Sequence, residues 1–300
     1  MNGMVKVGHH PIFYKYILIV TFITAISSRH CRVPMPLFTD DTFRSFLGNP
    51  LTYEHDWGLE WRFAVSKRAL ENYKSSLNET IYHHHSFFDL HNAIAEIGFP
   101  LSAKTLRHRY SGNPKDHKTR MGNLGEVIGA HLSRAYLHFN GEPIYPKRYN
   151  TNVEQSMKGI DILGFRDINS PAEIFVGEVK TGKRLYKSSS KEKKNPIEDA
   201  YETLCKHQRN EELPKILHFA RAYFQDDKIN LANVDRHMKS STPRKYLLLS
   251  LTEQKPSEPF SKIPEYKEKY GVIQELIAVH IEMKGLTEFL EALYSESSHV

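Results

Sequence analysis

The stretch GIDILGFRDINSPAEIFVGEVK, residues 159–180, decides the fold of this chain. It predicts two short apolar strands that are joined by a polar turn containing a proline. Asp161 belongs to the first predicted strand, and Glu178 and Lys180 belong to the second. Because side chains alternate across a strand, Glu178 and Lys180 project from the same face. Folding of the hairpin is expected to bring Asp161 near Glu178, so that two carboxylates and an amine gather at the end of an apolar sheet.

The composition is that of an ordinary globular protein. A length of 300 residues allows one large domain or two small ones, and 40% of the residues are hydrophobic and 25% charged. The net charge of +6 permits a polyanionic partner without requiring one. Two cysteines, Cys31 and Cys205, are too few for a disulfide framework or a zinc knuckle, and they favour a reducing, intracellular setting.

An apolar run near the N-terminus, YILIVTFITAI at residues 16–26, bears on location. It is short for a membrane span, and its content of Ile, Val, Thr and Phe favours a buried strand. We therefore expect a cytoplasmic protein without stable membrane association. Lys6 and Lys15 precede the run and small residues follow it, so a signal peptide is the alternative and a membrane anchor a further one.

Residues 37–108 are predicted to be mostly helical. Asp40 or Asp41 is expected to cap a short helix, and a longer amphipathic helix is expected from Leu59 to Leu77. Three consecutive histidines, 83–85, would point in different directions on a helix, which argues against a metal site there.

A stronger helix is predicted from Met121 to His138. Its apolar stripe, at helical spacing, consists of Leu124, Val127, Ile128, His131, Leu132 and Ala135, in which His131 reads as a core histidine. Gly122, Gly125 and Gly129 fall on a neighbouring face with Glu126 among them. Since each glycine costs a helix about 1 kcal/mol relative to alanine, another element is expected to approach this face closely and to meet Glu126.

The remaining elements complete an α/β pattern. Strands are predicted at residues 143–149, 245–252 and 275–283, a helix begins near Pro196, and a last helix covers residues 286–294. We divide the chain into an accessory, mainly helical region at 1–110 and a second domain at 111–300. The predicted core of that domain has the order α-β-β-β-α-β, with a central mixed sheet flanked by helices.

The carboxylates and the lysine suit metal-assisted chemistry on phosphates. Asp161 and Glu178 offer the hard oxygen ligands that Mg²⁺ prefers, and such an ion polarises a phosphoryl oxygen and activates water. Lys180 could orient or deprotonate that water, or neutralise charge on the phosphorus centre. Alternatively, Glu178 and Lys180 form an ordinary ion pair on an exposed edge strand, although the flanking apolar residues argue against that interpretation.

Two basic segments could hold a polyanion. TGKRLYKSSSKEKKN, residues 181–195, follows Lys180 directly, and RHRYSGNPKDHKTR, residues 107–120, precedes the glycine-rich helix. Contacts of this kind would be independent of sequence and weakened by salt. The residues expected to contact DNA phosphates are Lys183, Arg184, Lys187, Lys191, Lys193, Lys194, Lys118 and Arg120.

Asp161 followed by Glu178-Val179-Lys180, in this order of helix and strands, resembles the PD-(D/E)xK nuclease superfamily. Ile160 stands where that superfamily often has proline. More narrowly, the segments MGNLGEVIGAHL, KGIDILGF, FVGEVKTGK and DAYETLCKH resemble the HamA-like nuclease subunit of the Hachiman anti-phage defence system. The resemblance covers residues 115–255.

The resemblance implies a restriction-endonuclease-like core and a site built from the same residues. Asp161, Glu178, the backbone carbonyl of Val179 and Glu126 would bind Mg²⁺, for which Mn²⁺ could substitute, and Lys180 would be the catalytic lysine. It also implies DNA as the substrate and a helicase as a partner subunit. The function expected is therefore that of a metal-dependent DNA endonuclease in anti-phage defence. The alternatives are a stand-alone restriction or repair endonuclease, and a catalytically silent nucleic-acid-binding or helicase-adaptor module.

Overall fold

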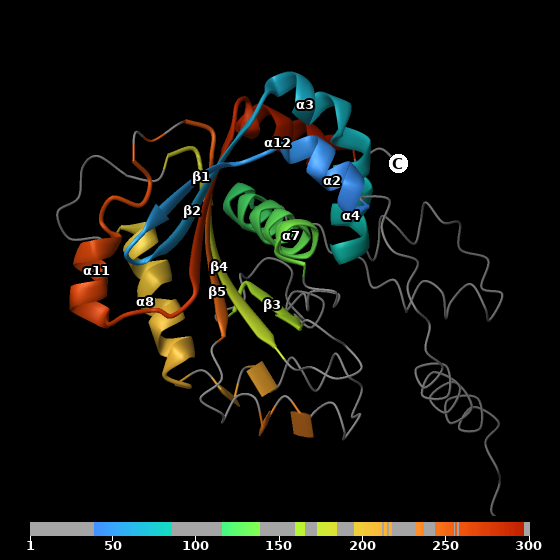
Figure 1. Ribbon diagram of the computed structural model, residues 1–300. Helices are drawn as coiled ribbons and strands as arrows, with labels where there is room; N and C mark the ends of the chain where they lie inside the picture. Colours follow the sequence, from blue (N-terminus) through green and yellow to red (C-terminus); the bar gives the residue numbers. More distant parts are fainter. Residues whose placement is uncertain are drawn as a thin grey trace, which may run out of the picture.

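The computed structural model describes the chain at residues 39–85, 116–138, 160–165, 173–184, 195–211, 213–214, 216–217, 232–233, 235–236, 244–254, 256 and 258–296. These residues form a six-stranded sheet in the order β1-β2-β6-β5-β4-β3 (Figure 1). Strands β2, β6, β5 and β4 are parallel, while β1 and β3 are antiparallel to their neighbours at the two edges. The predicted α/β class and mixed sheet are confirmed. The strands are β1 (Leu51–His55), β2 (Gly58–Val65), β3 (Ile162–Phe165), β4 (Ile174–Gly182), β5 (Lys245–Thr252) and β6 (Leu276–Met283).

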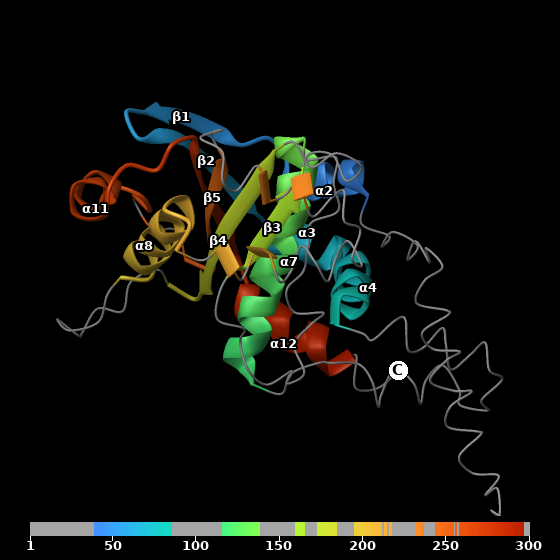
Figure 2. The same cartoon turned by 90° about the horizontal axis from the view of Figure 1, so that it is seen from below.

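Helices cover both faces of this sheet. On one side α7 packs against β3 and β4 and is itself covered by α2 and α4, while α8 packs against β4 and β5 on the other side, with α11 beside it (Figures 1 and 2). The helices are α2 (Asp40–Leu47), α3 (Lys67–Asn72), α4 (Lys74–His85), α7 (His117–Leu137), α8 (Pro196–Gln208), α11 (Ile263–Tyr270) and α12 (Leu286–Glu296). The predicted helices at residues 121–138 and 286–294 and the helix start near Pro196 are confirmed.

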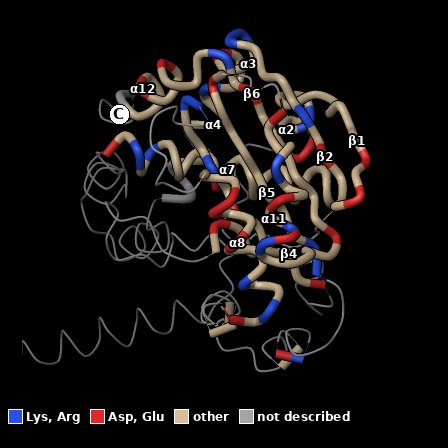
Figure 3. The backbone as a smooth tube through the Cα atoms, turned by 90° about the vertical axis from the view of Figure 1, so that its left-hand side faces the viewer, with Lys and Arg blue, Asp and Glu red and all other residues tan. Residues whose placement is uncertain are grey.

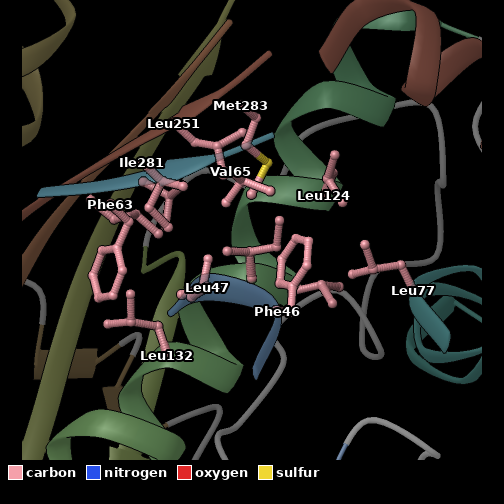
Figure 4. Close-up of a cluster of buried hydrophobic side chains, with 14 of the residues drawn as sticks. Phe46, Leu47, Phe63, Val65, Leu77, Leu124, Leu132, Leu251, Ile281 and Met283 are labelled. Atoms are coloured by element: carbon pink, nitrogen blue, oxygen red, sulfur yellow. The ribbon is translucent and has the colours of Figure 1, made fainter. Parts of the chain in front are cut away.

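Each face of the sheet has its own apolar core. Figure 4 shows part of the α7 core, to which Leu124 and Leu132 of α7 contribute together with Phe63 of β2, Ile281 of β6, and Phe46 and Leu47 of α2. The predicted stripe of α7 is buried throughout, and His131 is a core residue with 2% of its surface exposed. Burial lowers the pKa of His131 to about 3, so the imidazole is neutral.

Two of the three glycines of α7 allow the helix to approach the sheet. A Cβ at Gly129 would lie 2.9 Å from the Cδ2 of Leu249, and a Cβ at Gly125 would lie 2.8 Å from a methyl group of Val179. Gly122 has no neighbour within 4 Å of such a Cβ, so it plays no part in this contact. The close approach expected from the glycines is thus confirmed for Gly125 and Gly129.

The helix predicted from Leu59 to Leu77 is wrong in its first part. Residues Gly58–Val65 form β2, which pairs in parallel with β6, and helix α3 begins only at Lys67, capped by the hydroxyl of Ser66. The local spacing of apolar residues fits a helix, but β6 supplies a complete hydrogen-bonding edge, and this tertiary pairing overrides the weak local preference. Likewise, the side chain that caps α2 is Thr39, and Asp40 and Asp41 follow in the first turn.

The strands predicted at residues 245–252 and 275–283 are confirmed as β5 and β6, and both are buried along most of their length. The sheet therefore draws strands from both sides of the predicted boundary between residues 110 and 111, which itself lies outside the described residues. The predicted strand at residues 143–149 and the apolar run at residues 16–26 also lie outside them, as does Cys31; Cys205 is a buried free thiol. In the described ranges no helix is both long and apolar enough to cross a membrane.

Candidate active site

The hairpin formed by β3 and β4 places Asp161 beside Glu178. Ile162 pairs with Gly177 in the antiparallel register, so Asp161, which directly precedes β3, falls opposite Glu178. It was expected within the strand and lies one residue outside it. The Asp161 carboxylate accepts a hydrogen bond of 2.8 Å from the backbone N–H of Val179. The backbone of β4 thus holds one carboxylate at a fixed place next to the other.

Glu178 is a buried carboxylate, with 3% of its surface exposed. Burial, and then the charges of Asp161, Asp199 and Glu126, raise its pKa well above the usual range, while the Lys180 ammonium opposes this shift. Its Oε1 atom finds no hydrogen-bond donor in the part of the chain that the structure describes. Several carboxylates therefore lie close together in this site, and a bound cation would stabilise them.

Lys180 supplies part of the positive charge. Its Nζ lies 3.1 Å from Oδ2 of Asp199 and 3.9 Å from Oε2 of Glu178. Burial alone would lower the pKa of Lys180, but the carboxylates of Glu178, Asp161 and Asp199 outweigh it and raise the pKa. Lys180 consequently stands in this site as an ammonium ion.

Asp199 is a member of this cluster that the sequence analysis missed. It lies in the first turn of α8, which is capped by the side chain of Asn195 and has Pro196 as its first residue. Acidic residues are common in that position because they complement the helix dipole. Because the helix dipole already explains an acid at this position, the sequence does not indicate the contact of Asp199 with Lys180. That contact depends on how α8 packs against β4.

Glu126 reaches the same region from the opposite side. Because Gly125 has no side chain, α7 lies directly against Val179 and Thr181 of β4. Glu126, half-buried, is then near enough for its charge to contribute to the raised pKa of Glu178. In Figure 3, acidic segments of α7 and α8 are drawn in red next to one another at this end of the sheet.

A second residue missed by the sequence analysis is His207, in the last turn of α8. Its side chain is completely buried, and its Nε2 lies 3.9 Å from Oε1 of Glu178. The helical spacing of buried residues along α8 does not indicate a role for His207. The residue continues the stripe of Ala200, Tyr201 and Leu204, as an ordinary core residue would.

The basic residues predicted to contact DNA are only partly described. Lys183 and Arg184 are exposed directly after β4, where Arg184 contacts the side chain of Gln254. Lys118 is exposed in the first turn of α7, whereas the guanidinium of Arg120 lies 5.0 Å from the ring centre of Tyr294 in α12. The structure thus places these four at element ends. The others, Lys187, Lys191, Lys193 and Lys194, lie outside the described residues.

Comparison with known proteins decides the family. A sequence model of the family described as HamA matches residues 51–296, which is most of the chain. The chain belongs to the HamA family. It is also similar to the Hachiman protein HamA of Bacillus cereus, with 41% identity over 69 residues. This match covers 22% of the chain and 23% of the length of the relative.

The span matched by the HamA family begins at the first residue of β1 and ends at the last residue of α12. It therefore includes the edge hairpin of β1 and β2 as well as the cluster of Asp161, Glu178 and Lys180. The predicted resemblance to HamA is confirmed, and it extends further toward the N-terminus than the range from residue 115 onward on which it was recognised.

The donor set of this site fits a hard divalent cation. Asp161 and Glu178 present carboxylate oxygens at one end of the sheet, where Oε2 of Glu178 lies on the side of Lys180. Among the described residues no three His, Cys, Asp or Glu side chains stand together as a ready-made metal cage. Mg²⁺ suits such a site because it usually keeps several waters and binds through one or two carboxylates.

Proposed function

We propose that this member of the HamA family is a metal-dependent nuclease that hydrolyses phosphodiester bonds of DNA in anti-phage defence. The observation that carries the proposal is the burial of Glu178 between Asp161 and the Lys180 ammonium, because burial of a carboxylate costs stability and carboxylates with strongly shifted pKa values gather at functional sites. Membership in the HamA family supports the role in defence over that of a stand-alone restriction or repair enzyme.

Mg²⁺ is the proposed cofactor, and Mn²⁺ could replace it. Asp161, Glu178 and Glu126, with the backbone carbonyl of Val179, would hold the ion. When bound, such an ion polarises a phosphoryl oxygen and lowers the pKa of water, which makes a nucleophile available near neutral pH. The hydrogen bond from the N–H of Val179 keeps Asp161 oriented for this role without a cost of reorganisation.

Lys180 acts in the proposal as a charge stabiliser. The neighbouring carboxylates raise its pKa, which keeps the proton on Nζ. A protonated lysine cannot remove a proton from water, but it donates hydrogen bonds and attracts the negative charge that develops on the phosphate oxygens. In this form Lys180 suits orientation and charge neutralisation, two of the roles considered from the sequence.

DNA is the proposed substrate, and the exposed Lys183, Arg184 and Lys118 are proposed to contact its phosphates together with Arg120 and the lysines at 187–194. Contacts of this kind give affinity without sequence preference. A helicase subunit is the proposed partner, on the strength of the resemblance to the Hachiman nuclease subunit.

The experiment is a plasmid-nicking assay with Mg²⁺ or chelator, with and without the partner subunit. Asp161→Ala and Lys180→Ala are compared with Lys245→Ala, a matched control because Lys245 is similarly buried in the next strand but pairs with Glu173 away from the site. We expect nicking only with the metal. The nicking rate should fall by about a hundredfold or more in the two site variants and should be unchanged in the Lys245→Ala control. Equal nicking by the wild type and both site variants would contradict the catalytic roles proposed for Asp161 and Lys180.

A further inference from the structure

The two oxygens of Glu178 face different surroundings. Oε2 lies 3.9 Å from Nζ of Lys180, which is itself paired with the exposed Asp199. Oε1 points to the interior, where Nε2 of His207 lies 3.9 Å away. The first oxygen therefore faces the ammonium of Lys180, and the second faces a buried imidazole of α8.

Oε1 of Glu178 is buried and has no hydrogen-bond partner among the described residues. An N–H···O hydrogen bond spans 2.7–3.2 Å, so a closure of about 1 Å between Nε2 and Oε1 would form one. Buried polar atoms are almost always satisfied, and a carboxylate left without a donor is destabilising.

His207 is held firmly enough to serve as that donor. Its backbone carbonyl accepts a hydrogen bond of 3.0 Å from the guanidinium of the buried Arg244. The next residue, Gln208, donates to the carbonyl of Val272 at 2.7 Å and accepts from the N–H of Gln274 at 2.9 Å. These contacts fix the last turn of α8, which carries His207, against the segment that leads into β6.

We infer that His207 is a positioning residue for Glu178, whose Nε2–H donates to Oε1 and thereby directs Oε2 to the metal. The inference rests on the proposed function, because the orientation of Glu178 matters only if Glu178 is a metal ligand. A ligand carboxylate that is itself hydrogen-bonded binds in one defined orientation, and loss of such a supporting partner commonly weakens metal binding by about 10–100-fold.

The first test measures Mn²⁺ binding to the full chain by calorimetry, without DNA. His207→Phe keeps the ring and removes both nitrogens, and His207→Gln keeps an N–H donor. His131→Phe is the matched control, because His131 is an equally buried histidine of α7 that stacks on Phe43. We expect His207→Phe to weaken Mn²⁺ binding by about tenfold or more, His207→Gln to restore part of it, and His131→Phe to leave it unchanged. Wild-type affinity in a folded His207→Phe protein would overturn the inference.

The second test needs no variant of His207 to fold, because it reads the tautomer of the wild-type protein without metal. Long-range nitrogen–proton NMR should find the proton of His207 on Nε2, with a resonance that shifts in Glu178→Gln. A proton on Nδ1 alone would overturn the inference, since Nε2 would then be an acceptor and could not donate to Oε1. If the wild type binds Mn²⁺ and cuts DNA but carries the His207 proton on Nδ1, the role of His207 is overturned and the proposed nuclease function is not. A wild type that does neither overturns the proposed function, and the metal-directing role of His207 with it.

Discussion

The ammonium of Lys180 lies 3.1 Å from the carboxylate of Asp199, closer than to Glu178 on its own strand. Asp199 is the exposed partner of this pair, with 58% of its side chain accessible, whereas that of Lys180 is only 26% accessible. An anion from solvent can therefore displace Asp199 without opening the fold. A DNA phosphate is such an anion in the proposed function, so Asp199 competes with the substrate for Lys180.

Removing this competition should strengthen DNA binding. We expect Asp199→Asn to lower the dissociation constant for duplex DNA by up to about fivefold, which corresponds to the upper end of the 0.2–1 kcal/mol typical of exposed ion pairs. The measurement is fluorescence anisotropy in chelator at low salt, so that nothing is cleaved. Glu198→Gln is the control, since it removes the same charge one residue away, where the partner is Lys269 of α11. Unchanged or weaker binding by Asp199→Asn would contradict the expectation.

The raised pKa of Glu178 predicts how stability depends on pH without metal. An unfolded glutamate has a pKa of about 4.3, so the stabilising effect of the neutral carboxyl is complete below that pH and disappears as pH rises through the higher folded value. Above it, the fold contains a buried charge. We therefore expect Glu178→Gln to raise the free energy of unfolding by about 1–3 kcal/mol at pH 8 in chelator, with a gain that vanishes toward pH 4.

Urea unfolding with chelator at several pH values checks this. Mg²⁺ added to the wild type should restore stability at pH 8, and it should have no such effect on Glu178→Gln, because a ligand that binds only the native state stabilises it. A Glu178→Gln protein that is less stable than the wild type at pH 8 in chelator would contradict the raised pKa of Glu178.

The glycines of α7 should differ sharply when replaced by alanine. Gly129→Ala places a methyl group 2.9 Å from Leu249, so we expect a loss of about 1–3 kcal/mol in the free energy of unfolding. Gly122→Ala is the matched control. It meets nothing within 4 Å and should stabilise the helix by about 0.5–1 kcal/mol. Urea denaturation of the two variants beside the wild type decides the matter, and similar effects at both positions would contradict the packing described for Gly129.

His131 should make the protein sensitive to acid. Its pKa is lowered to about 3 by burial, whereas in the unfolded chain it is about 6.5. The group therefore contributes its stability above pH 6.5, and this contribution is lost as pH falls through the range between the two values. Relative to His131→Phe, the wild type should lose about 2 kcal/mol between pH 7 and pH 5. The difference between the two unfolding curves isolates His131, because all other groups are shared, and parallel pH profiles would refute a neutral imidazole in the fold.

The sequence predicted the parts of the site that depend on local pattern. The alternation of IFVGEVK put Glu178 and Lys180 on one face, opposite Phe175 and Val179, and the two cores contain the flanking residues accordingly. Continuous apolar runs identified β5 and β6, and the stripe of α7 identified its buried face. These predictions succeed because a strand and a long amphipathic helix each carry their periodicity in a few consecutive residues.

The sequence alone thus determined the hairpin, its paired carboxylates and the glycine-faced helix that approaches it. The tertiary structure decided that Gly58–Val65 is a strand, that Asp199 is the acid that pairs with Lys180, and that His207 lies behind Glu178. The physical reason is the same in all three cases. Periodicity is a property of neighbouring residues, whereas these contacts depend on which distant backbone edge or helix end is packed against them, through hydrogen bonds and burial that no local pattern records.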